Sequence, residues 1–210
     1  MPRAAKDVDE SRAGLPIRAF ASAALFEQWL AAQPADSKGL WLKLARQGSG
    51  VASVGKQEAI EAALCHGWID GQLNAYDECF WLVRFTPRTS KSRWSEVNRA
   101  TADRLAAEGR MSAAGLAQIE AAKQDGRWAG AYAPQSKAEV PPDLQAALDA
   151  QPAAKAFFAT LKGANRFAVL YRIQDAKTPA TRQARIDKFV GMLARGEVLH
   201  PPKPPAAKTT

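Results

Sequence analysis

The chain has 210 residues, of which 47% are hydrophobic and 24% are charged. This is the composition of a globular protein, and it excludes disorder along the whole chain. No apolar run approaches the roughly 18 residues that a membrane span needs, and the start of the chain, MPRAAKDVDESRAG, lacks the apolar segment of a secretory signal. Two cysteines are too few for a disulfide scaffold and fit a reducing compartment. We therefore expect a cytoplasmic protein without a membrane span.

The net charge of +8 is concentrated towards the C-terminus, where residues 141–210 hold 11 Lys and Arg against 5 Asp and Glu. A solvated basic surface and a nucleic-acid-binding face are the two interpretations of this excess, and the first is favoured. The nucleic-acid alternative places a helical module at 141–195, and its charge would come from Arg166, Arg172, Arg182, Arg185, Lys188 and Arg195.

The first half of the chain mixes helical and strand patterns. Alternation of Leu40, Leu42 and Leu44 with other side chains predicts a half-buried strand over 40–45. Two more strands are predicted on either side of the polar turn at 74–77, and helices are predicted around them. These two strands are placed at 68–73 and 79–85, and the helices at 24–32 and 56–65. These strands predict a small antiparallel three-stranded sheet packed by helices.

The remainder of the chain reads as helical. Ser95 and Ser112 are predicted to cap helices that end near residues 108 and 125, and four further helices are expected at 142–150, 153–162, 166–176 and 179–195. The fold class is therefore α+β and helix-dominated, with an all-helical C-terminal lobe. The expected organisation is a flexible N-terminal tail at 1–19, an α+β lobe at 20–131, a linker at 132–142, a helical lobe at 143–196 and a Pro-rich tail at 197–210.

The glycine-rich segment GSGVASVGKQEAI, at residues 48–60, has the spacing of a phosphate-binding loop through Gly50, Gly55 and Lys56. The next residue in that motif is a Ser or Thr that holds Mg²⁺, and here it is Gln57. Nothing after residue 86 reads as a strand, although such loops belong to sheets with several buried parallel strands. We therefore interpret these glycines as turn residues.

The segment RFTPRTSKSRWSEVNR carries several cations and a single acid, Glu96. Guanidinium groups and the start of a helix both favour anions, so this segment predicts a site for a small anion such as phosphate or a carboxylate. The predicted ligand-binding residues are Arg84, Arg88, Lys91, Arg93 and Trp94. The alternative is that these arginines pair with Asp70, Asp77 and Glu78 and only hold the lobe together.

His66 and Asp70 flank the turn between a predicted helix and strand, and they are weak candidates for an acid–base pair. The alternative for His66 is a capping or packing role. The four Cys and His side chains lack paired ligand spacing, so no metal site is predicted, and no cofactor is expected. Whether the protein is an enzyme is left open.

Several linked motifs resemble one family. The stretches EAALCHGWIDGQ, RFTPR, KSRWSEVNR, GRMSAAG, AKQDGRW and AKTPATRQARIDKFVGMLARG occur in this order and cover about residues 20–195. They resemble the YdeI/OmpD-associated family, also called bacteriocin-protection proteins. The resemblance implies a small bacterial protein linked to envelope stress or to resistance against antimicrobial peptides, and it implies no known reaction or catalytic residues.

Three classes of function follow from these observations. The first is a cytoplasmic stress or resistance protein that binds an anionic ligand or a protein partner through the FTPR–KSRW region. The second is an uncharacterised enzyme that uses His66 and Asp70. The third is the nucleic-acid-binding module at 141–195, whose affinity would fall steeply with salt.

Overall fold

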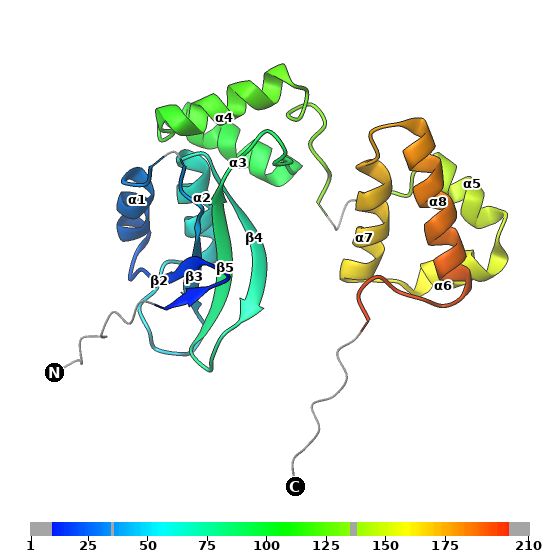
Figure 1. Cartoon of the computed structure of the whole chain (residues 1–210), viewed down its shortest axis with the longest axis horizontal. Coiled ribbons are helices and arrows are strands. Elements are labelled where there is room, and N and C mark those ends of the chain that lie inside the picture. Colours follow the sequence, from blue (N-terminus) through cyan, green and yellow to red (C-terminus); the bar gives the residue numbers. More distant parts are fainter. Residues whose placement is uncertain (1–9, 35, 135–137, 202–210) are drawn as a thin grey trace, which may run out of the picture. The chain divides into compact units, whose positions relative to one another are not determined.

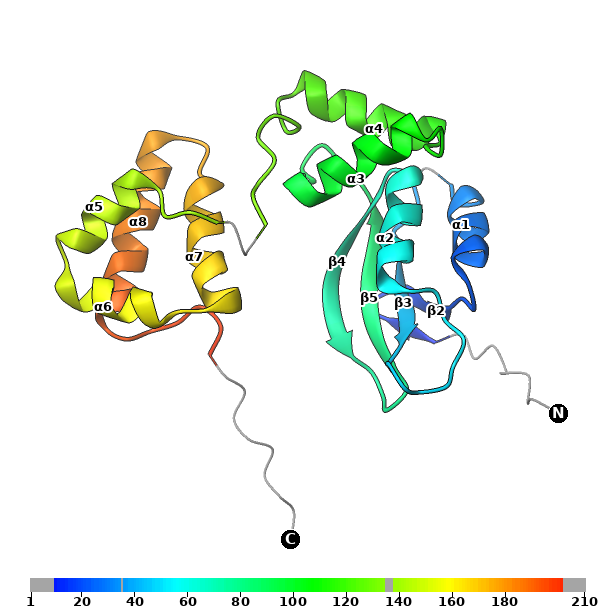
Figure 2. The same ribbon diagram turned by 180° about the vertical axis from the view of Figure 1, so that it is seen from behind.

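The computed structural model describes residues 10–34, 36–134 and 138–201. The chain divides into two compact units, residues 1–131 and residues 132–210, which appear in Figures 1 and 2. The outer parts of the two predicted tails, residues 1–9 and 202–210, lie outside the described residues, as do Ala35 and residues 135–137 of the predicted linker.

The first unit is built on a five-stranded sheet with the order β1-β2-β3-β5-β4. Strand β2 is parallel to β3, whereas the other neighbouring pairs are antiparallel. The bounds are Ser11–Arg12 for β1, Leu15–Ala19 for β2, Leu40–Ala45 for β3, Trp68–Ala75 for β4 and Phe80–Pro87 for β5.

The predicted antiparallel three-stranded sheet is therefore wrong, although an α+β class fits the structure. Strands β1 and β2 were missed, and they lie in the segment that had been assigned to the N-terminal tail. Strand β1 has two residues, and β2 contains Pro16, a residue that strands admit only at edges, ends or bulges. Strand β2 pairs with β3, which lies in a later part of the chain, and local patterns carry no signal for such a partner.

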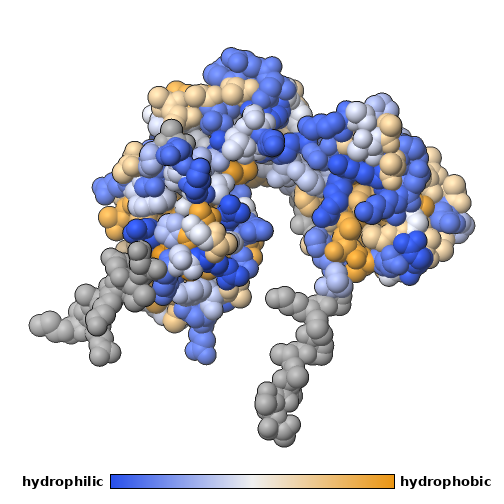
Figure 3. All heavy atoms as spheres, viewed as in Figure 1, coloured by the Kyte–Doolittle hydropathy of each residue, from blue (hydrophilic) through white to orange (hydrophobic). Residues whose placement is uncertain are grey.

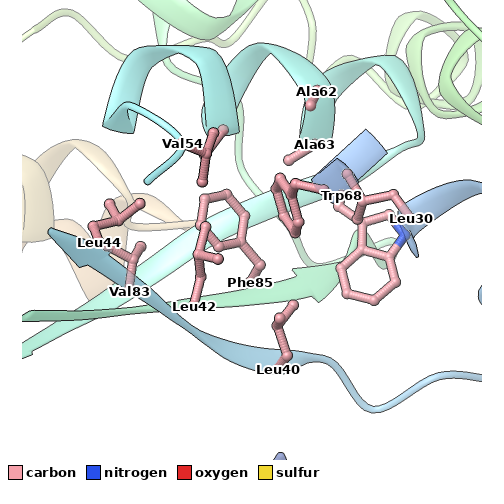
Figure 4. Close-up of a cluster of buried hydrophobic side chains, with 12 residues drawn as sticks. Leu30, Leu40, Leu42, Leu44, Val54, Ala62, Ala63, Trp68, Val83 and Phe85 are labelled. Atoms are coloured by element: carbon pink, nitrogen blue, oxygen red, sulfur yellow. The ribbon is translucent and has the colours of Figure 1, made fainter. Parts of the chain in front are cut away.

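Helices α1 (Ala23–Ala31) and α2 (Lys56–Cys65) cover one face of this sheet. Figure 4 shows how leucines of β3 and the side chains of Val83 and Phe85 on β5 meet the small residues Ala62 and Ala63 of α2. Trp68 and Leu30 lie together at one end of this cluster. Alanines on α2 let the helix lie close to the sheet, so the aromatic and leucine side chains fill the layer between them.

The other face of the sheet carries a smaller apolar cluster, Leu15, Trp41 and Leu82. The segment before β2 lies against it: the Glu10 carboxylate reaches Lys43 Nζ at 2.6 Å and accepts from the Tyr76 hydroxyl at 2.6 Å. The backbone oxygen of Arg12 accepts from the Trp41 indole at 3.1 Å. The bonds from Lys43 and Tyr76 hold the pKa of Glu10 below its usual range.

Two helices follow the sheet and pack beside α2. Helix α3 (Glu96–Ala107) begins after Ser95, and α4 (Ala113–Gln124) begins after Ser112. Both serine side chains accept a hydrogen bond from the helix they precede, at 3.1 and 3.2 Å, which confirms them as caps. A second core cluster joins α2, α3 and α4 through Leu64, Leu105 and Ile119.

Two glycines make the contact between α2 and α4 possible. Gly67 has φ of +74°, as expected for the residue after a helix end, and a Cβ there would lie 3.0 Å from the carbonyl oxygen of Ala114. Gly115 lies inside α4, where a Cβ would fall 2.3 Å from the carbonyl oxygen of Cys65. The start of α4 can therefore meet the end of α2 only with glycine at residue 115.

The second unit is helical and has its own core. Its helices are α5 (Pro142–Asp149), α6 (Pro152–Thr160), α7 (Gly163–Gln174) and α8 (Pro179–Ala194). On α8, Ile186, Phe189 and Leu193 are buried, as the helical spacing predicts. Figure 3 shows that the visible face of each unit is mostly hydrophilic, with smaller hydrophobic areas between.

We expect Gly115→Ala to lower the free energy of unfolding by about 1–3 kcal/mol, because the added methyl group overpacks the α2–α4 contact. Gly191→Ala is the matched control, since Gly191 is also helical and its nearest neighbour would be an Arg195 side-chain atom at 3.7 Å. That control should stabilise the protein by up to about 1 kcal/mol. Scanning calorimetry of the full chain measures both changes, and a Gly115→Ala protein as stable as the wild type would refute the close contact.

Candidate functional site

A cavity of about 450 Å³ lies in the first unit, where four segments meet. The end of α1, the turn from α2 to β4, the end of β5 and the first turn of α4 each supply part of the wall. The polar residues that line it are Gln33, His66, Arg88, Ser112 and Gln118. The apolar ones are Leu30, Ala31, Pro34, Trp68, Pro87, Ala113 and Ala114.

Arg88 brings a positive charge to this wall. It follows Pro87 at the end of β5, and its backbone N–H donates to the carbonyl oxygen of Gly67 at 2.9 Å. Its guanidinium lies over the Trp94 ring, with the central carbon 3.6 Å from the ring centroid, and Nη1 donates to the carbonyl oxygen of Arg93 at 3.3 Å. Arg88 is only 5% exposed. Stacking on an indole stabilises a cation that burial would otherwise penalise.

His66 also lines the cavity, and its position follows from the end of α2. Its backbone N–H donates to the last turn of the helix, and Gly67 then turns the chain into β4. The carboxylate that reaches its ring is Glu27 of α1, with 3.8 Å between Nε2 and Oε1. Asp70 lies on β4 opposite Phe85 and does not line the cavity. The structure therefore brings His66 next to Glu27 rather than pairing it with Asp70.

The first turn of α4 forms another part of the wall. The Ser112 hydroxyl donates to the carbonyl oxygen of Cys65 at 2.8 Å and accepts from the N–H of Gly115 at 3.2 Å. Ala113 and Ala114 follow it and line the cavity. Backbone N–H groups at a helix start carry partial positive charge. The residues that line the cavity include a guanidinium and this helix start, and none of them is an Asp or Glu. The lining residues therefore include one basic side chain, Arg88, and no acidic one.

The other predicted anion-binding residues lie apart from this wall. Arg84 pairs with Trp41 across β3 and β5, which places it on the sheet face opposite α1 and α2. Lys91 is exposed in the turn after β5, and Arg93 is half-buried and contributes its backbone oxygen to Arg88. The structure thus brings Arg88 and Trp94 together, and of the four basic side chains in the prediction Arg88 is the one that lines the cavity.

Several residues near the cavity escaped sequence reasoning. Ser112 was noted only as a cap, while Glu27 and Gln118 were not considered. Arg127 was also missed: its Nη1 donates to the carbonyl oxygen of Ser92 at 2.9 Å and to that of Thr89 at 3.4 Å, and its Nε contacts Asp125 at 2.7 Å. For these missed residues the sequence held one usable indication. Ala114 and Gln118 are four residues apart on α4, so they were expected to lie on the same helix face.

The glycine loop before α2 does not offer its helix start to a ligand. Glu58, in the first turn of α2, accepts from the backbone N–H of Gly55 at 2.8 Å. The Glu58 carboxylate thus uses an N–H group that a phosphate-binding loop would offer to a phosphate. Gly48 and Gly50 have φ of +83° and +70°, as turn glycines do. The interpretation of this segment as a turn is therefore supported by the geometry.

Within the described ranges, no group of three or more His, Cys, Asp or Glu side chains gathers as a metal site would require. The same residues contain no helix with the length and apolar character needed to cross a bilayer. Burial raises the pKa of the Cys65 thiol, which keeps that side chain in its protonated form at neutral pH.

Five of the six basic residues proposed for nucleic acid have contacts within the second unit that the structure defines. Arg182 forms two bonds with Asp143, at 2.5 and 2.9 Å, and also donates to the carbonyl oxygen of Ile173. Other contacts join Arg195 to Glu197, Arg185 to Asp175, Arg172 to the carbonyl oxygen of Ala168 and Arg166 to the Phe158 ring, while Lys188 is exposed. Much of the charge on these residues is therefore balanced internally or used in packing.

Comparison with known proteins assigns the two units to different family models. Residues 137–196 match the family described as Bacteriocin-protection, YdeI or OmpD-Associated. Residues 18–118 match a domain of unknown function, DUF8412. No curated protein and no solved structure matches the chain. The resemblance to the bacteriocin-protection family is thus confirmed for the C-terminal unit, over a shorter part of the chain than the motifs had indicated.

The Arg182–Asp143 pair predicts a pH-dependent contribution to the stability of the second unit. The bonds from Arg182 lower the pKa of Asp143. The pair therefore stabilises the fold above the unfolded-state pKa of about 3.9, and this stabilisation is lost as the pH falls through the lower folded-state value. We expect Arg182→Gln to lower the melting temperature at pH 7, with a smaller difference near pH 2.

Arg195→Gln is the control for this measurement, because the Arg195–Glu197 pair lies two residues apart on the exposed surface and should contribute little. Calorimetry of the full chain from pH 2 to pH 7 gives both melting temperatures. An Arg182→Gln effect that is independent of pH would show that the bond to the Ile173 carbonyl, and not the ion pair, is what matters.

Proposed function

We propose that the cavity in the first unit binds a small anionic ligand, with Arg88 as its principal anchor. The observation that carries the proposal is Arg88, a basic residue that lines a cavity of about 450 Å³ although it is only 5% exposed. A charge held away from bulk water interacts more strongly with a ligand than an exposed one. None of the residues that line the cavity is an Asp or Glu.

The remaining polar groups of the cavity suit the same ligand. The first-turn N–H groups of α4 add partial positive charge, and the side-chain amide of Gln118 adds donors. Trp94 and the Arg93 carbonyl fix the plane of the Arg88 guanidinium. This arrangement supports binding rather than a particular reaction.

The biological setting that we propose comes from the second unit. Its match to the bacteriocin-protection family supports a role in bacterial stress resistance or in resistance to antimicrobial peptides. In this proposal the protein acts in the cytoplasm. Binding of the anionic ligand in the cavity of the first unit is the molecular activity that underlies the resistance role. A protein partner for the helical unit remains part of the proposal.

Thermal unfolding of the full chain with phosphate, sulfate and acetate tests anion binding. We expect a saturable rise in melting temperature that Arg88→Met removes, because hydrogen bonds to a charged group contribute about 1.5–3 kcal/mol and their loss weakens binding about 10- to 100-fold. Arg18→Met is the matched control, since Arg18 is exposed on β2 and does not line the cavity. Lys91→Met should also leave binding intact.

Arg88→Met also removes the stacking on Trp94, so the unliganded variant is expected to melt at a lower temperature. Direct titration calorimetry at a temperature where the variant is folded separates this effect from binding. Equal anion affinity in the wild type and in Arg88→Met would refute the proposal. Loss of affinity in Lys91→Met would instead move the site to the exposed turn after β5.

A further inference from the structure

We infer that the outer edge of strand β4 is an interaction surface, which takes an extended acidic segment of a protein partner as an additional strand. The inference goes beyond the anion cavity, because the surface lies in the second half of β4, whereas the cavity is lined by Trp68 at its start. It follows from the unpaired main chain of this edge, from the apolar surface beside it and from two cations that border that surface.

The main chain of β4 is paired on one side. This strand ends the sheet order, and Figure 1 shows it as the outermost strand on its side of the sheet. Within the described part of the chain, β4 pairs with β5, and its other edge has no backbone partner. Alternate N–H and C=O groups along such an edge point outwards. A row of these groups is a template for one more strand.

The features that protect a sheet edge are confined to the first half of β4. The pairing shifts by one residue between Asp70 and Leu73, so a bulge interrupts the edge there, and Asp70 adds a charge. Residues 72–75 read QLNA and contain no charged residue and no proline. Edges are usually blunted by charges, prolines or bulges. The second half of β4 is therefore the part that can accept a strand.

Leu73 gives this half of the edge an apolar contact, since it is 54% exposed. Ala75 is directly opposite Trp81 on β5, and Leu73 lies two residues before Ala75, so the three side chains share one face of the sheet. Together with Arg46 and Asn74 these residues line a shallow hollow of about 260 Å³. An apolar side chain placed in this hollow would remove part of Leu73 and Trp81 from water.

Two exposed cations border the same surface. Arg46 lines the hollow and donates through Nε to the carbonyl oxygen of Asp77 at 3.0 Å. Lys56, at the start of α2, lies over the Trp81 ring, with 5.6 Å between Nζ and the ring centroid. Among the residues that the structure describes, neither cation has a carboxylate within ion-pair distance. Charge complementarity therefore favours a segment with acidic side chains.

A strand that pairs with β4 presents every second side chain to this hollow. An apolar side chain can then cover Leu73, while an acidic side chain two residues along faces Arg46 or Lys56. A second copy of the chain fits less well, because a stable interface buries about 1,200–2,000 Å² and four edge residues from each copy are too few for that area. A short segment of a partner, bound transiently, needs no such area.

The experiment titrates the ¹⁵N-labelled full chain with end-blocked peptides and follows the backbone amides by NMR. The acidic probe is Thr-Ile-Thr-Glu-Thr-Ile-Thr-Glu, which places isoleucine and glutamate on one face of a strand. One control peptide has glutamine in place of glutamate. The other keeps the acidic sequence and has every backbone nitrogen methylated, which removes the donors of a strand ladder.

We expect the acidic peptide to bind saturably and at least about tenfold more tightly than the glutamine peptide, because the ion pairs to the two cations are lost in the latter. The methylated peptide should not bind. The amides that shift should centre on residues 72–75.

Variants of exposed residues test the location. Leu73→Glu should weaken binding of the acidic peptide about tenfold or more, because it removes the apolar contact and adds a like charge. Leu116→Glu is the matched control, since Leu116 is 45% exposed on α4 and lies outside this surface. The double change Arg46→Gln and Lys56→Gln should remove the preference for the acidic over the glutamine peptide, whereas Arg18→Gln, on β2, should keep it.

Each alternative result overturns a stated part of the inference. A lack of saturable shifts with the acidic peptide, or shifts away from β4, would overturn it as a whole. Equal binding of the glutamine peptide would overturn the acidic partner, and equal binding of the methylated peptide would overturn strand addition. A concentration-dependent dimer in analytical ultracentrifugation that Leu73→Glu dissociates would assign the edge to a second copy in place of a partner segment.

Discussion

The contact between the end of α2 and the start of α4 is the constraint on which the first unit depends. The carbonyl oxygen of Cys65 accepts both the N–H and the hydroxyl of Ser112, and Gly115 permits the two backbones to approach. Buried backbone oxygens need such partners, and this one obtains two from a single residue. The same contact sets the first turn of α4 beside the turn that carries His66 and Gly67. The cavity is therefore a consequence of helix packing and not of a flexible loop.

Much of the secondary structure could be predicted from the sequence because its signals are local. Ser95, Ser112 and Thr178 each accept a bond from the helix that follows them, and the apolar period of α8 identifies its buried face. Strands β1 and β2 could not be found in this way. Strand β1 has two residues and therefore no detectable alternation, and β2 pairs with β3, which is distant in the sequence. The error in the sheet is a failure to foresee a non-local pairing.

The site shows the same division between local and non-local information. Arg88 and His66 stand out in the sequence as polar residues at element ends, whereas Glu27, Ser112 and Gln118 reach the same region from other helices. Strand alternation turns Arg84 to the opposite sheet face. Arg88 escapes that alternation because β5 ends at Pro87 and the chain is then bound to Gly67. The end of β5 at Pro87 is therefore the reason that Arg88, and not Arg84, lines the cavity. The family match of the C-terminal unit carries no information on this choice, since it covers residues 137–196 only.

The hydrogen bonds from Arg127 to Thr89 and Ser92 tie the end of helix α4 to the turn after β5. Helix α4 is fixed at its start to Cys65, and just after its end Arg127 donates to carbonyl oxygens of the turn that follows Arg88. Arg88 is in turn bonded to Gly67, two residues after Cys65. These contacts form a closed circuit of protein around one side of the cavity. Separating any of these segments requires breaking one of the contacts. We therefore expect the backbone amides of these segments to exchange their hydrogens as one cooperative unit.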